Sequence, residues 1–355
     1  MKTKNDIEIV KGSREFVGLA QRIYQLIESE SKRGNMLSRD FQDIQNEIDD
    51  NRCFIALYEQ EPIGYVCVYP WSNLGLVEIA SLVVGFDYRK QGIGTRLVNQ
   101  AQRLAIKVFP EWKIVSLAND HSSHIFRKSG LISIPKCCLP PELWEPCSRC
   151  KNWGKLPSCH CTGLIQSETR GRFHIEPLLI ENASLTENVA KIYCQIWKEP
   201  PWNEDFWNVK DVVSGLKQEL RVSESYGFVV SNHDEIVSFT WGYRVNVAKL
   251  AQIAGHNQLD YLFNGKLRKV FYIDELGTAK EYRGNKIGKE LSWQLLSVME
   301  KQGFDLVLLR TDVQAIVARN LYQKLGFQEL PIFDKKHQHR TYWTLTLSPR
   351  KNELE

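Results

Sequence analysis

Two short glycine-containing turns could do chemistry in this chain. Residues 89–94 read RKQGIG, and residues 283–288 read RGNKIG. Each turn follows an apolar, strand-like run and precedes a segment whose apolar residues recur every three or four positions, which predicts strand, turn and helix in succession. A helix N-terminus has backbone N–H groups without intrahelical partners and a partial positive charge, and glycine lets a ligand approach the backbone. Such a turn suits the binding of a phosphate or pyrophosphate.

The elements that position these turns occur twice. Arg89 and Arg283 lie 194 residues apart, whereas earlier in each half Gly64 aligns with Ser238 at an offset of 174. The chain therefore contains an internal repeat, and its second copy carries an insertion of 20 residues before the turn. We expect the insertion within residues 246–266 and predict that it forms a substrate loop.

The first copy shows how each turn is flanked. Apolar spacing predicts helices over residues 13–30 and 94–108. Residues 53–59 and 62–69 read as a β-hairpin, and residues 77–84 read as the strand that leads into the turn. The second copy repeats this succession, so both turns are expected between a strand and an amphipathic helix.

Length and composition agree with two soluble domains. The chain has 355 residues, too many for one typical core, and neither a signal peptide nor a stretch of 18 apolar residues is apparent. We therefore expect a cytoplasmic protein without a membrane span. The net charge of +4 comes from scattered Lys and Arg, which gives no reason to expect a nucleic-acid partner.

Three motifs in order, found twice, resemble the GNAT superfamily of acyl-CoA-dependent N-acyltransferases. They read EIASLVV, RKQGIG and NDHSSHIFRKSGL in the first half, and YIDELGT, RGNKIG and AIVARNLYQKLGF in the second. The resemblance implies an α/β chain of two tandem GNAT folds, each a mixed, mostly antiparallel twisted sheet with flanking helices. We expect a first domain over 1–136, a Cys-rich segment and linker over 137–166, and a second domain over 167–355.

The resemblance also implies the residues that would hold acyl-CoA. The strand before each turn would be splayed from its neighbour, so that its main chain pairs with the pantetheine arm while the turn cradles the pyrophosphate. In the first half these residues are Leu82, Val83, Val84, Arg89, Lys90, Gln91, Gly92, Ile93, Gly94 and Thr95, with Asn119 and Phe126 nearby. In the second half they are Leu276, Gly277, Thr278, Arg283, Gly284, Asn285, Lys286, Ile287 and Gly288.

The reaction implied is attack of a neutral amine on a thioester, which a carboxylate base and a hydroxyl acid would assist. Glu78 stands where the histone acetyltransferase branch has its base; the alternative is a solvated residue at a strand end. Asp274 and Glu275 are possible bases of the second half. Tyr322 occupies the position of the family's general acid, whereas Phe126 in the first half cannot donate a proton.

The two halves differ in completeness. Lys286 replaces the first glycine of the second turn, and Ala315 replaces the asparagine that Asn119 represents. The sequence slightly favours the first half as the catalytic one and leaves both open. The expected function is transfer of an acetyl or longer acyl group from CoA to a primary amine, on a small molecule or a peptide. The alternative is an inert acyl-CoA-binding sensor or scaffold.

The junction between the halves is rich in cysteine. Cys147 and Cys150, followed by Cys159, His160 and Cys161, have spacing suited to a tetrahedral zinc; the alternative is unmetallated thiols, and disulfides are disfavoured in a reducing compartment. The segment also looks like the tail of N-acetylglutamate-synthase-like GNATs. The stretch GNMLSRD matches the same group, which implies a substrate contact for Arg39.

Overall fold

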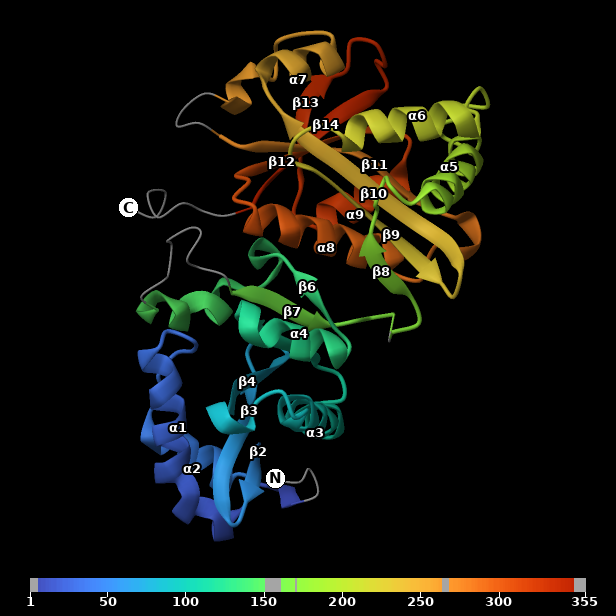
Figure 1. The fold of residues 1–355 in the computed structure, drawn as a ribbon. Coiled ribbons are helices and arrows are strands. Elements are labelled where there is room, and N and C mark those ends of the chain that lie inside the picture. The colour runs from blue at the N-terminus through green and yellow to red at the C-terminus, as the bar shows by residue number, and fades with distance from the viewer. Residues whose placement is uncertain (1–5, 151–160, 170, 264–267, 348–355) are drawn as a thin grey trace. The chain divides into compact units, whose positions relative to one another are not determined.

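The computed structural model describes residues 6–150, 161–169, 171–263 and 268–347 (Figure 1). The chain separates into two compact units. The first comprises Met1–Ser133 and Leu139–Ser167, and the second comprises Ile134–Cys138 and Glu168–Glu355. Within the described ranges, no helix combines the length and the apolar character needed to cross a lipid bilayer.

The first unit is built on a seven-stranded sheet. Its strands, in spatial order, are β1 (Ile7–Lys11), β2 (Cys53–Tyr58), β3 (Glu61–Trp71), β4 (Leu76–Val84), β5 (Lys113–Ala118), β7 (Thr162–Gln166) and β6 (Leu131–Ile134). Neighbouring strands from β1 to β7 pair antiparallel, except that β4 and β5 are parallel. The expected mixed, mostly antiparallel sheet is therefore confirmed.

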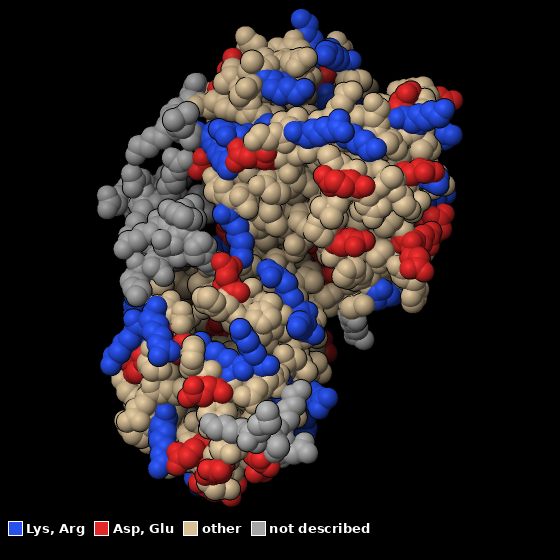
Figure 2. All heavy atoms as spheres, viewed as in Figure 1, with Lys and Arg blue, Asp and Glu red and all other residues tan. Residues whose placement is uncertain are grey.

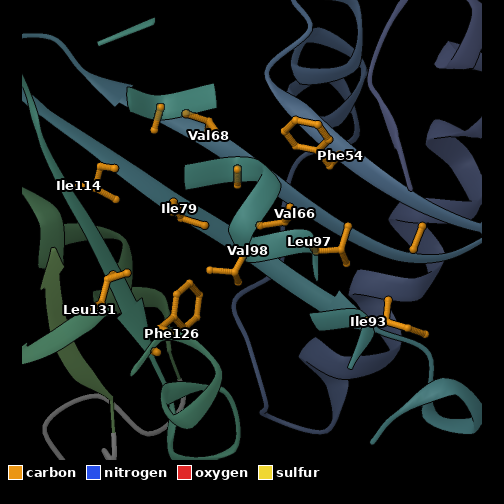
Figure 3. Close-up of a cluster of buried hydrophobic side chains, with 14 of the residues drawn as sticks. Phe54, Val66, Val68, Ile79, Ile93, Leu97, Val98, Ile114, Phe126 and Leu131 are labelled. Atoms are coloured by element: carbon orange, nitrogen blue, oxygen red, sulfur yellow. The ribbon is translucent and has the colours of Figure 1, made fainter. Parts of the chain in front are cut away.

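Helices cover both faces of this sheet. Successive side chains of a strand point to opposite faces, so alternate residues of β2 belong to different buried clusters. Cys53, Ile55 and Leu57 of β2 belong to one buried cluster with residues of α1 (Ala20–Lys32) and α2 (Phe41–Asp49). Phe54 and Ala56 belong to the cluster on the other face. Figure 3 shows that cluster, in which residues of α3 (Ile93–Val108) and α4 (Asp120–Lys128) meet the sheet.

The second unit repeats this plan. Its strands, in spatial order, are β8 (His174–Pro177), β9 (Ser225–Asn232), β10 (Glu235–Val245), β11 (Val270–Thr278), β12 (Leu306–Asp312), β14 (Arg340–Thr346) and β13 (Gln328–Phe333). Its helices are α5 (Ala183–Trp197), α6 (Val209–Leu220), α7 (Val247–Ala254), α8 (Ile287–Lys301) and α9 (Ile316–Lys324). In both sheets the last two strands are exchanged in space, so the two units share one topology (Figure 1).

Two predicted segments differ in detail. The helix expected over 13–30 begins as the 3-10 helix Arg14–Leu19, and its α-helical part, α1, starts at Ala20. The insertion expected within 246–266 is partly helical, since it forms α7 and the 3-10 helix Asp260–Phe263. Its last three residues lie outside the described part of the chain.

A fork opens in each sheet between its two parallel strands. β4 pairs with β5 only from Leu76 to Glu78, although β4 continues to Val84. In the second unit β11 pairs with β12 from Val270 to Ile273 and continues to Thr278. The expected splay is thus present twice, and one backbone edge of residues 82–84 and of residues 276–278 faces each fork.

The first sheet extends further along the chain than the sequence suggested. Residues 162–166, which we assigned to the linker, form β7 and pair with β5, with Leu164 opposite Ser116. The 3-10 helix Pro141–Arg149 in the Cys-rich segment buries Leu143 and Trp144. We therefore propose a domain boundary beside Ser167, at the end of the first unit.

Charges of both signs mix on the surface. On the face drawn in Figure 2, Lys and Arg side chains are interspersed with Asp and Glu side chains among the described residues. This distribution matches the scattered charges of the sequence, whose net value is +4.

Candidate active site

The two glycine turns adopt the same backbone conformation. In the first turn Lys90 and Gly92 have φ angles of 62° and 80°; in the second, the aligned Gly284 and Lys286 have φ angles of 83° and 64°. Each turn therefore places glycine at a different one of its two left-handed positions. A left-handed residue other than glycine costs about 1–2 kcal/mol, and each turn bears this cost once, at Lys90 and at Lys286.

Both turns offer backbone N–H groups to an anion. At the start of α3 the first hydrogen bond runs from the N–H of Arg96 to the carbonyl of Gly92 at 3.1 Å, and at the start of α8 from Glu290 to Lys286 at 3.1 Å. The N–H groups of residues 93–95 and 287–289 lie ahead of these bonds and have no acceptor within their helix. Together with the helix dipole, they fit a pyrophosphate at either turn.

The lysine in the second turn does not obstruct it. A Cβ placed on Gly92 would meet no atom within 4 Å among the described residues. The equivalent Lys286 is exposed, so its side chain has open space. The bulk of Lys286 therefore does not close the second turn to a phosphate.

An arginine anchors each turn to the strand before it. The Nε of Arg89 donates to the Val84 carbonyl at 3.0 Å, and the Nε of Arg283 donates to the Thr278 carbonyl at 3.0 Å. Arg89 also pairs with Glu30 at 2.8 Å and, in the second unit, Arg283 pairs with Glu199 at 2.7 Å. These contacts give both arginines a positioning role at the turn.

The first fork holds one candidate base. Glu78 is the last residue of β4 that pairs with β5, and its carboxylate accepts a hydrogen bond from Nε1 of Trp71 at 3.1 Å. Burial raises the pKa of Glu78; the Trp71 hydrogen bond and the charge of Arg39 lower it, and the net shift is upward. A raised pKa suits a carboxylate that must accept a proton near neutral pH.

A half-buried cation, Arg39, lies beside the first fork. Arg39 donates to the hydroxyl of Ser81 at 2.6 Å and to the carboxylate of Glu47 at 2.5 Å, and Tyr65 donates to Glu47 at 2.6 Å. Ser81 has a φ of 56° and sits where the β3–β4 register shifts, between Tyr65 and Cys67. This β-bulge turns Ser81 toward Arg39. Arg39, for which the sequence implied a substrate contact, therefore lies beside β4, the strand that forms one side of the fork.

The two remaining first-unit residues have local structural roles. Asn119 caps α4 by accepting the N–H of Ser122 at 3.0 Å, and its amide donates to the carbonyl of Asn35. Phe126 is 2% exposed and lies beside Val98 and Leu131 in the core (Figure 3). Phe126 therefore packs in the core at the position that corresponds to the family's general acid.

The second fork gathers three carboxyl groups. Asp274 and Glu275 lie on β11 at a β-bulge opposite Trp241 and Gly242, and Glu219 comes from α6. Each carboxyl accepts a hydrogen bond from a neutral aromatic donor. Nε1 of Trp241 donates to Glu219 at 2.7 Å, the hydroxyl of Tyr243 donates to Asp274 at 3.0 Å, and the hydroxyl of Tyr193 donates to Glu275 at 3.1 Å. We call Glu219, Asp274 and Glu275 the acidic trio.

Burial raises the pKa of every member of the trio. Burial raises the pKa of Glu219 to about 7, and the charge of Asp274 adds to the effect. Burial likewise raises the pKa of Asp274, and it raises that of Glu275 well above its usual range, with further contributions from both neighbouring carboxylates. Neighbouring carboxylates repel one another when all are ionised, so the three groups of this half-buried site tend to share protons.

A tyrosine reaches this cluster from the other side of the fork. Tyr322 on α9 is 7% exposed and packs against Phe327 and Trp343. Burial and the charge of Glu275 raise the pKa of Tyr322, so its hydroxyl lies within electrostatic range of that carboxylate. Within the described residues this hydroxyl has no hydrogen-bond partner, so it is available to a bound group.

A family profile matches most of the chain. The acetyltransferase (GNAT) family profile matches twice, over residues 20–131 and 187–327. The chain belongs to the GNAT acetyltransferase family. It is therefore an N-acyltransferase with acyl-CoA as co-substrate, and each GNAT match contains one of the turns and forks described above.

The relatives of this GNAT chain described next are similar to part of its length. An uncharacterized N-acetyltransferase of Chlorobaculum tepidum is 30% identical over 131 residues, which cover 37% of this chain and 81% of the relative. N-alpha-acetyltransferase 30 of Schizosaccharomyces pombe is 39% identical over 56 residues, 16% of this chain and 37% of that protein. The structure of PaiA N-acetyltransferase from Thermoplasma acidophilum in complex with coenzyme A gives a TM-score of 0.36 at 14% identity, covering 49% of this chain and 98% of that one.

Sequence reasoning missed several residues of the second GNAT fork. Glu219 lies 55 residues before Asp274 in a helix whose sequence, VKDVVSGLKQEL, carries no motif. Tyr193 lies in the middle of α5 and reads as a packing residue. Only the fold brings these side chains to β11, so no local signal could have found them.

The cysteine segment of this GNAT chain is only partly described. Cys147 is buried, and Cys150 and Cys161 are half-buried; Cys159 and His160 lie outside the described residues. Among the residues that the structure describes, no group of three or more His, Cys, Asp or Glu side chains could hold a metal ion. The zinc site therefore stays a prediction.

Proposed function

We propose that the second unit carries out acyl transfer to an amine, with Glu275 as general base and Tyr322 as general acid. The sequence slightly favoured the first half. The observation that carries the proposal is the hydroxyl of Tyr322, which has no hydrogen-bond partner among the described residues, is not enclosed by the protein, and lies near enough to Glu275 for that carboxylate to raise the pKa of Tyr322. The first unit has Phe126 at the equivalent position, and Phe126 is a core residue.

Glu275 removes the proton that an amine carries at neutral pH. An ammonium group of pKa ~10.4 must lose this proton before its nitrogen can attack. A carboxylate accepts the proton more readily when its pKa is raised, because each pKa unit corresponds to about 1.4 kcal/mol. Burial and the two neighbouring carboxylates raise the pKa of Glu275, so it is a stronger base than an exposed glutamate.

Tyr322 completes the proton balance. The amine nitrogen forms a bond to the thioester carbonyl carbon, and the bond from that carbon to sulfur then breaks. The hydroxyl of Tyr322 donates its proton to the departing thiolate, and Glu275 holds the proton taken from the amine. The products are an amide and free CoA, and proton exchange with water returns both side chains to their starting state.

The turns and forks support acyl-CoA binding in both units. Residues 284–288 would hold the pyrophosphate in the second unit, and the open edge of residues 276–278 would pair with the pantetheine arm. Residues 90–94 and 82–84 would do the same in the first unit, where Glu78 is the candidate base. We infer that the first unit is an acyl-CoA-binding module whose own transfer, if present, is slower because Phe126 cannot donate a proton.

Removal of the Tyr322 hydroxyl tests this assignment. Tyr322→Phe keeps the ring in its packing site, and kcat for acetyl transfer should fall by roughly 100-fold, a typical contribution of a general acid. Tyr226→Phe removes a hydroxyl from the same unit, where its ring packs against Phe271, and should leave kcat unchanged. Equal rates for Tyr322→Phe and the wild type would overturn the proposal.

A further inference from the structure

We propose that the first unit docks an acidic, extended segment of a partner protein on one face of α3, beside the open edge of β1. This face presents four residues at helical spacing, which we call the α3 stripe: Arg96, Asn99, Arg103 and Ile106. The stripe lies outside both forks, so its role is independent of the proposed acyl transfer.

The same helix face is covered in the second unit. The internal repeat aligns α3 with α8 at an offset of 194 residues, so the stripe corresponds to Glu290, Trp293, Ser297 and Glu300. All four of these α8 residues are buried, whereas all four residues of the α3 stripe are exposed. Equivalent faces of the two copies therefore have different environments.

Backbone N–H groups hold two chain segments against the α8 face. The N–H groups of Glu168 and Thr169 donate to the carboxylate of Glu290 at 2.6 and 3.1 Å. The N–H of Lys136 donates to both carboxylate oxygens of Glu300 at 3.3 Å. Both donor segments belong to the second unit. This face of the repeat can thus bind chain segments through their backbone groups.

The α3 stripe has the opposite charge. Arg96 stands where α8 has Glu290, and α3 has no Asp or Glu residue along its length. Among the described residues, neither Arg96 nor Arg103 has a carboxylate partner. A guanidinium group donates hydrogen bonds and accepts none, so the stripe favours a ligand that supplies acceptors and negative charge. An acidic segment supplies both.

A cavity lies between the α3 stripe and β1. Its volume is about 230 Å³, and it is lined by Ile9, Arg96, Asn99, Gln100 and Arg103. The lining combines two guanidinium groups with two side-chain amides and has no acidic residue. A carboxylate that enters this cavity therefore meets two cations and no like charge.

The edge of β1 offers backbone groups to a segment bound here. In the spatial order of the sheet β1 is the terminal strand and pairs with β2. The N–H of Gly12 donates to the carbonyl of Cys53 at 2.9 Å, whereas the carbonyl of Ile7 accepts from Arg96 at 3.2 Å. In an antiparallel pair, alternate residues turn both backbone groups to the same side, so Ile7 and Ile9 turn theirs to the open edge. An extended peptide can pair with Ile9 as an added strand.

The spacing of the arginines indicates the spacing of the acidic residues. Arg96 and Arg103 are seven residues apart on α3, a rise of about 10.5 Å. In a strand, residues i and i+2 point to the same face and lie about 7 Å apart, and the reach of the long Arg and Glu side chains covers the difference. Ile106, 51% exposed, offers an apolar contact one turn beyond Arg103. The segment proposed therefore has two acidic residues on one face of a strand.

Peptide binding to the full chain tests this surface. The probe is the peptide Thr-Thr-Glu-Val-Glu-Thr-Thr, blocked at both ends, which we call the Glu peptide; in the Gln peptide, glutamine replaces both glutamates. We expect fluorescence anisotropy at low ionic strength to give at least about tenfold tighter binding of the Glu peptide. Equal binding of the two peptides would overturn the proposal.

Charge reversal on the stripe should reverse the preference. In Arg103→Glu the affinity for the Glu peptide should fall by at least about tenfold, and a peptide with lysine in place of both glutamates should bind this variant more tightly than the wild type. Arg103→Gln should give a smaller loss in the same direction. Both variants should keep the wild-type number of CoA sites, which checks that they fold.

Lys128→Glu is the matched control for charge. Lys128 is an exposed cation at the end of α4 and outside the stripe, so its reversal should leave the affinity for the Glu peptide unchanged. Equal losses in Lys128→Glu and Arg103→Glu would mean that net charge alone attracts the peptide, and would overturn the proposal.

Hydrogen exchange distinguishes an added strand from ionic adhesion. The Glu peptide should slow exchange at the Ile9 amide by at least about tenfold, because a backbone N–H paired in a sheet is protected. Binding of the Glu peptide without protection of Ile9 would contradict the docking geometry.

Two other occupants would give different results. A single-stranded oligothymidylate that binds the wild type but not Arg103→Glu, while the Glu peptide fails to bind, would assign the face to nucleic acid. A dimer that Arg103→Glu dissociates in analytical ultracentrifugation, again without binding of the Glu peptide, would assign it to a second copy of the chain. Either result would overturn the proposal.

Discussion

Lys286 adopts a left-handed backbone conformation, with φ at 64°, at the position where Gly92 has φ at 80°. The two residues each lie just before the helix that follows their turn. A lysine held in this conformation stores strain that a glycine would not. The first turn has the reverse arrangement, with Lys90 at 62° where Gly284 has 83°, so each turn keeps the same geometry with one lysine in a strained conformation.

Removing this strain should stabilise the protein. We expect Lys286→Gly to raise the free energy of unfolding of the second unit by about 1 kcal/mol, as measured by urea denaturation. Gln218→Gly lies inside α6 and should lower that free energy by about 1 kcal/mol, because glycine is a poor helix former. A lower stability for Lys286→Gly would show that the lysine side chain makes a compensating contact.

The Gly92 position should govern CoA binding in the first unit. Gly92→Glu adds bulk and negative charge where the pyrophosphate would lie, and calorimetry should show one CoA site fewer than in the wild type. Gly75→Glu is the matched control, because Gly75 also has a positive φ, at 62°, and open space around its Cβ. An undiminished number of sites in Gly92→Glu would contradict the assignment of this turn.

Two glutamine variants should identify the unit that carries out transfer. We expect Glu275→Gln to reduce kcat by at least about 100-fold, with the larger loss at pH values above the raised pKa of Glu275, where the wild-type carboxylate is ionised and can accept a proton. Glu78→Gln should leave the rate of acyl transfer nearly unchanged. The reverse order of effects would assign the chemistry to the first unit, whose Glu78 also has a raised pKa.

The acidic trio should make the ligand-free protein less stable as pH rises. The pKa of Glu219 is raised to about 7 in the folded chain from an ordinary value of 4.5, so between these two values the folded chain binds the proton more tightly than the unfolded chain. The free energy of unfolding should therefore fall across this window, on the order of 2–3 kcal/mol at about 1.4 kcal/mol per pKa unit.

Denaturation at several pH values can measure this slope. Glu219→Gln should flatten the decline between about pH 4.5 and pH 7, since glutamine does not titrate. Glu281→Gln, at an exposed residue of the 3-10 helix Lys280–Tyr282, should keep the wild-type slope. A wild-type slope in Glu219→Gln would mean that other groups cause the decline.

The cysteine segment gives a prediction about metal. If Cys147 and Cys150 join Cys159, His160 or Cys161 around zinc, chelation should lower the melting temperature of the first unit. Cys147→Ser should have the same effect, whereas Cys194→Ser, in α5 of the second unit, should not respond to chelation differently from the wild type. Protein prepared without chelators under reducing conditions should contain one zinc by elemental analysis, and none would refute the site.

The sequence by itself determined the repeated fold and the place of the turns. Apolar periodicity and glycine positions are local, so they predicted both strand–turn–helix units, and the resemblance to the GNAT superfamily implied the splayed strands next to them. The sequence misplaced residues 162–166, which we assigned to the linker, because β7 gains its pairing from Ser116 and its neighbours in β5 rather than from its own pattern.

Only the tertiary structure decided the character of each fork. Arg39 reaches Ser81 from a segment 42 residues earlier, and Glu219 reaches Asp274 from a helix 55 residues earlier. No spacing rule links such pairs, because their contacts depend on how helices pack on the sheet and on where a β-bulge redirects a side chain. The charge of each site is a sum over side chains from separate elements, and that sum exists only once the elements have packed together.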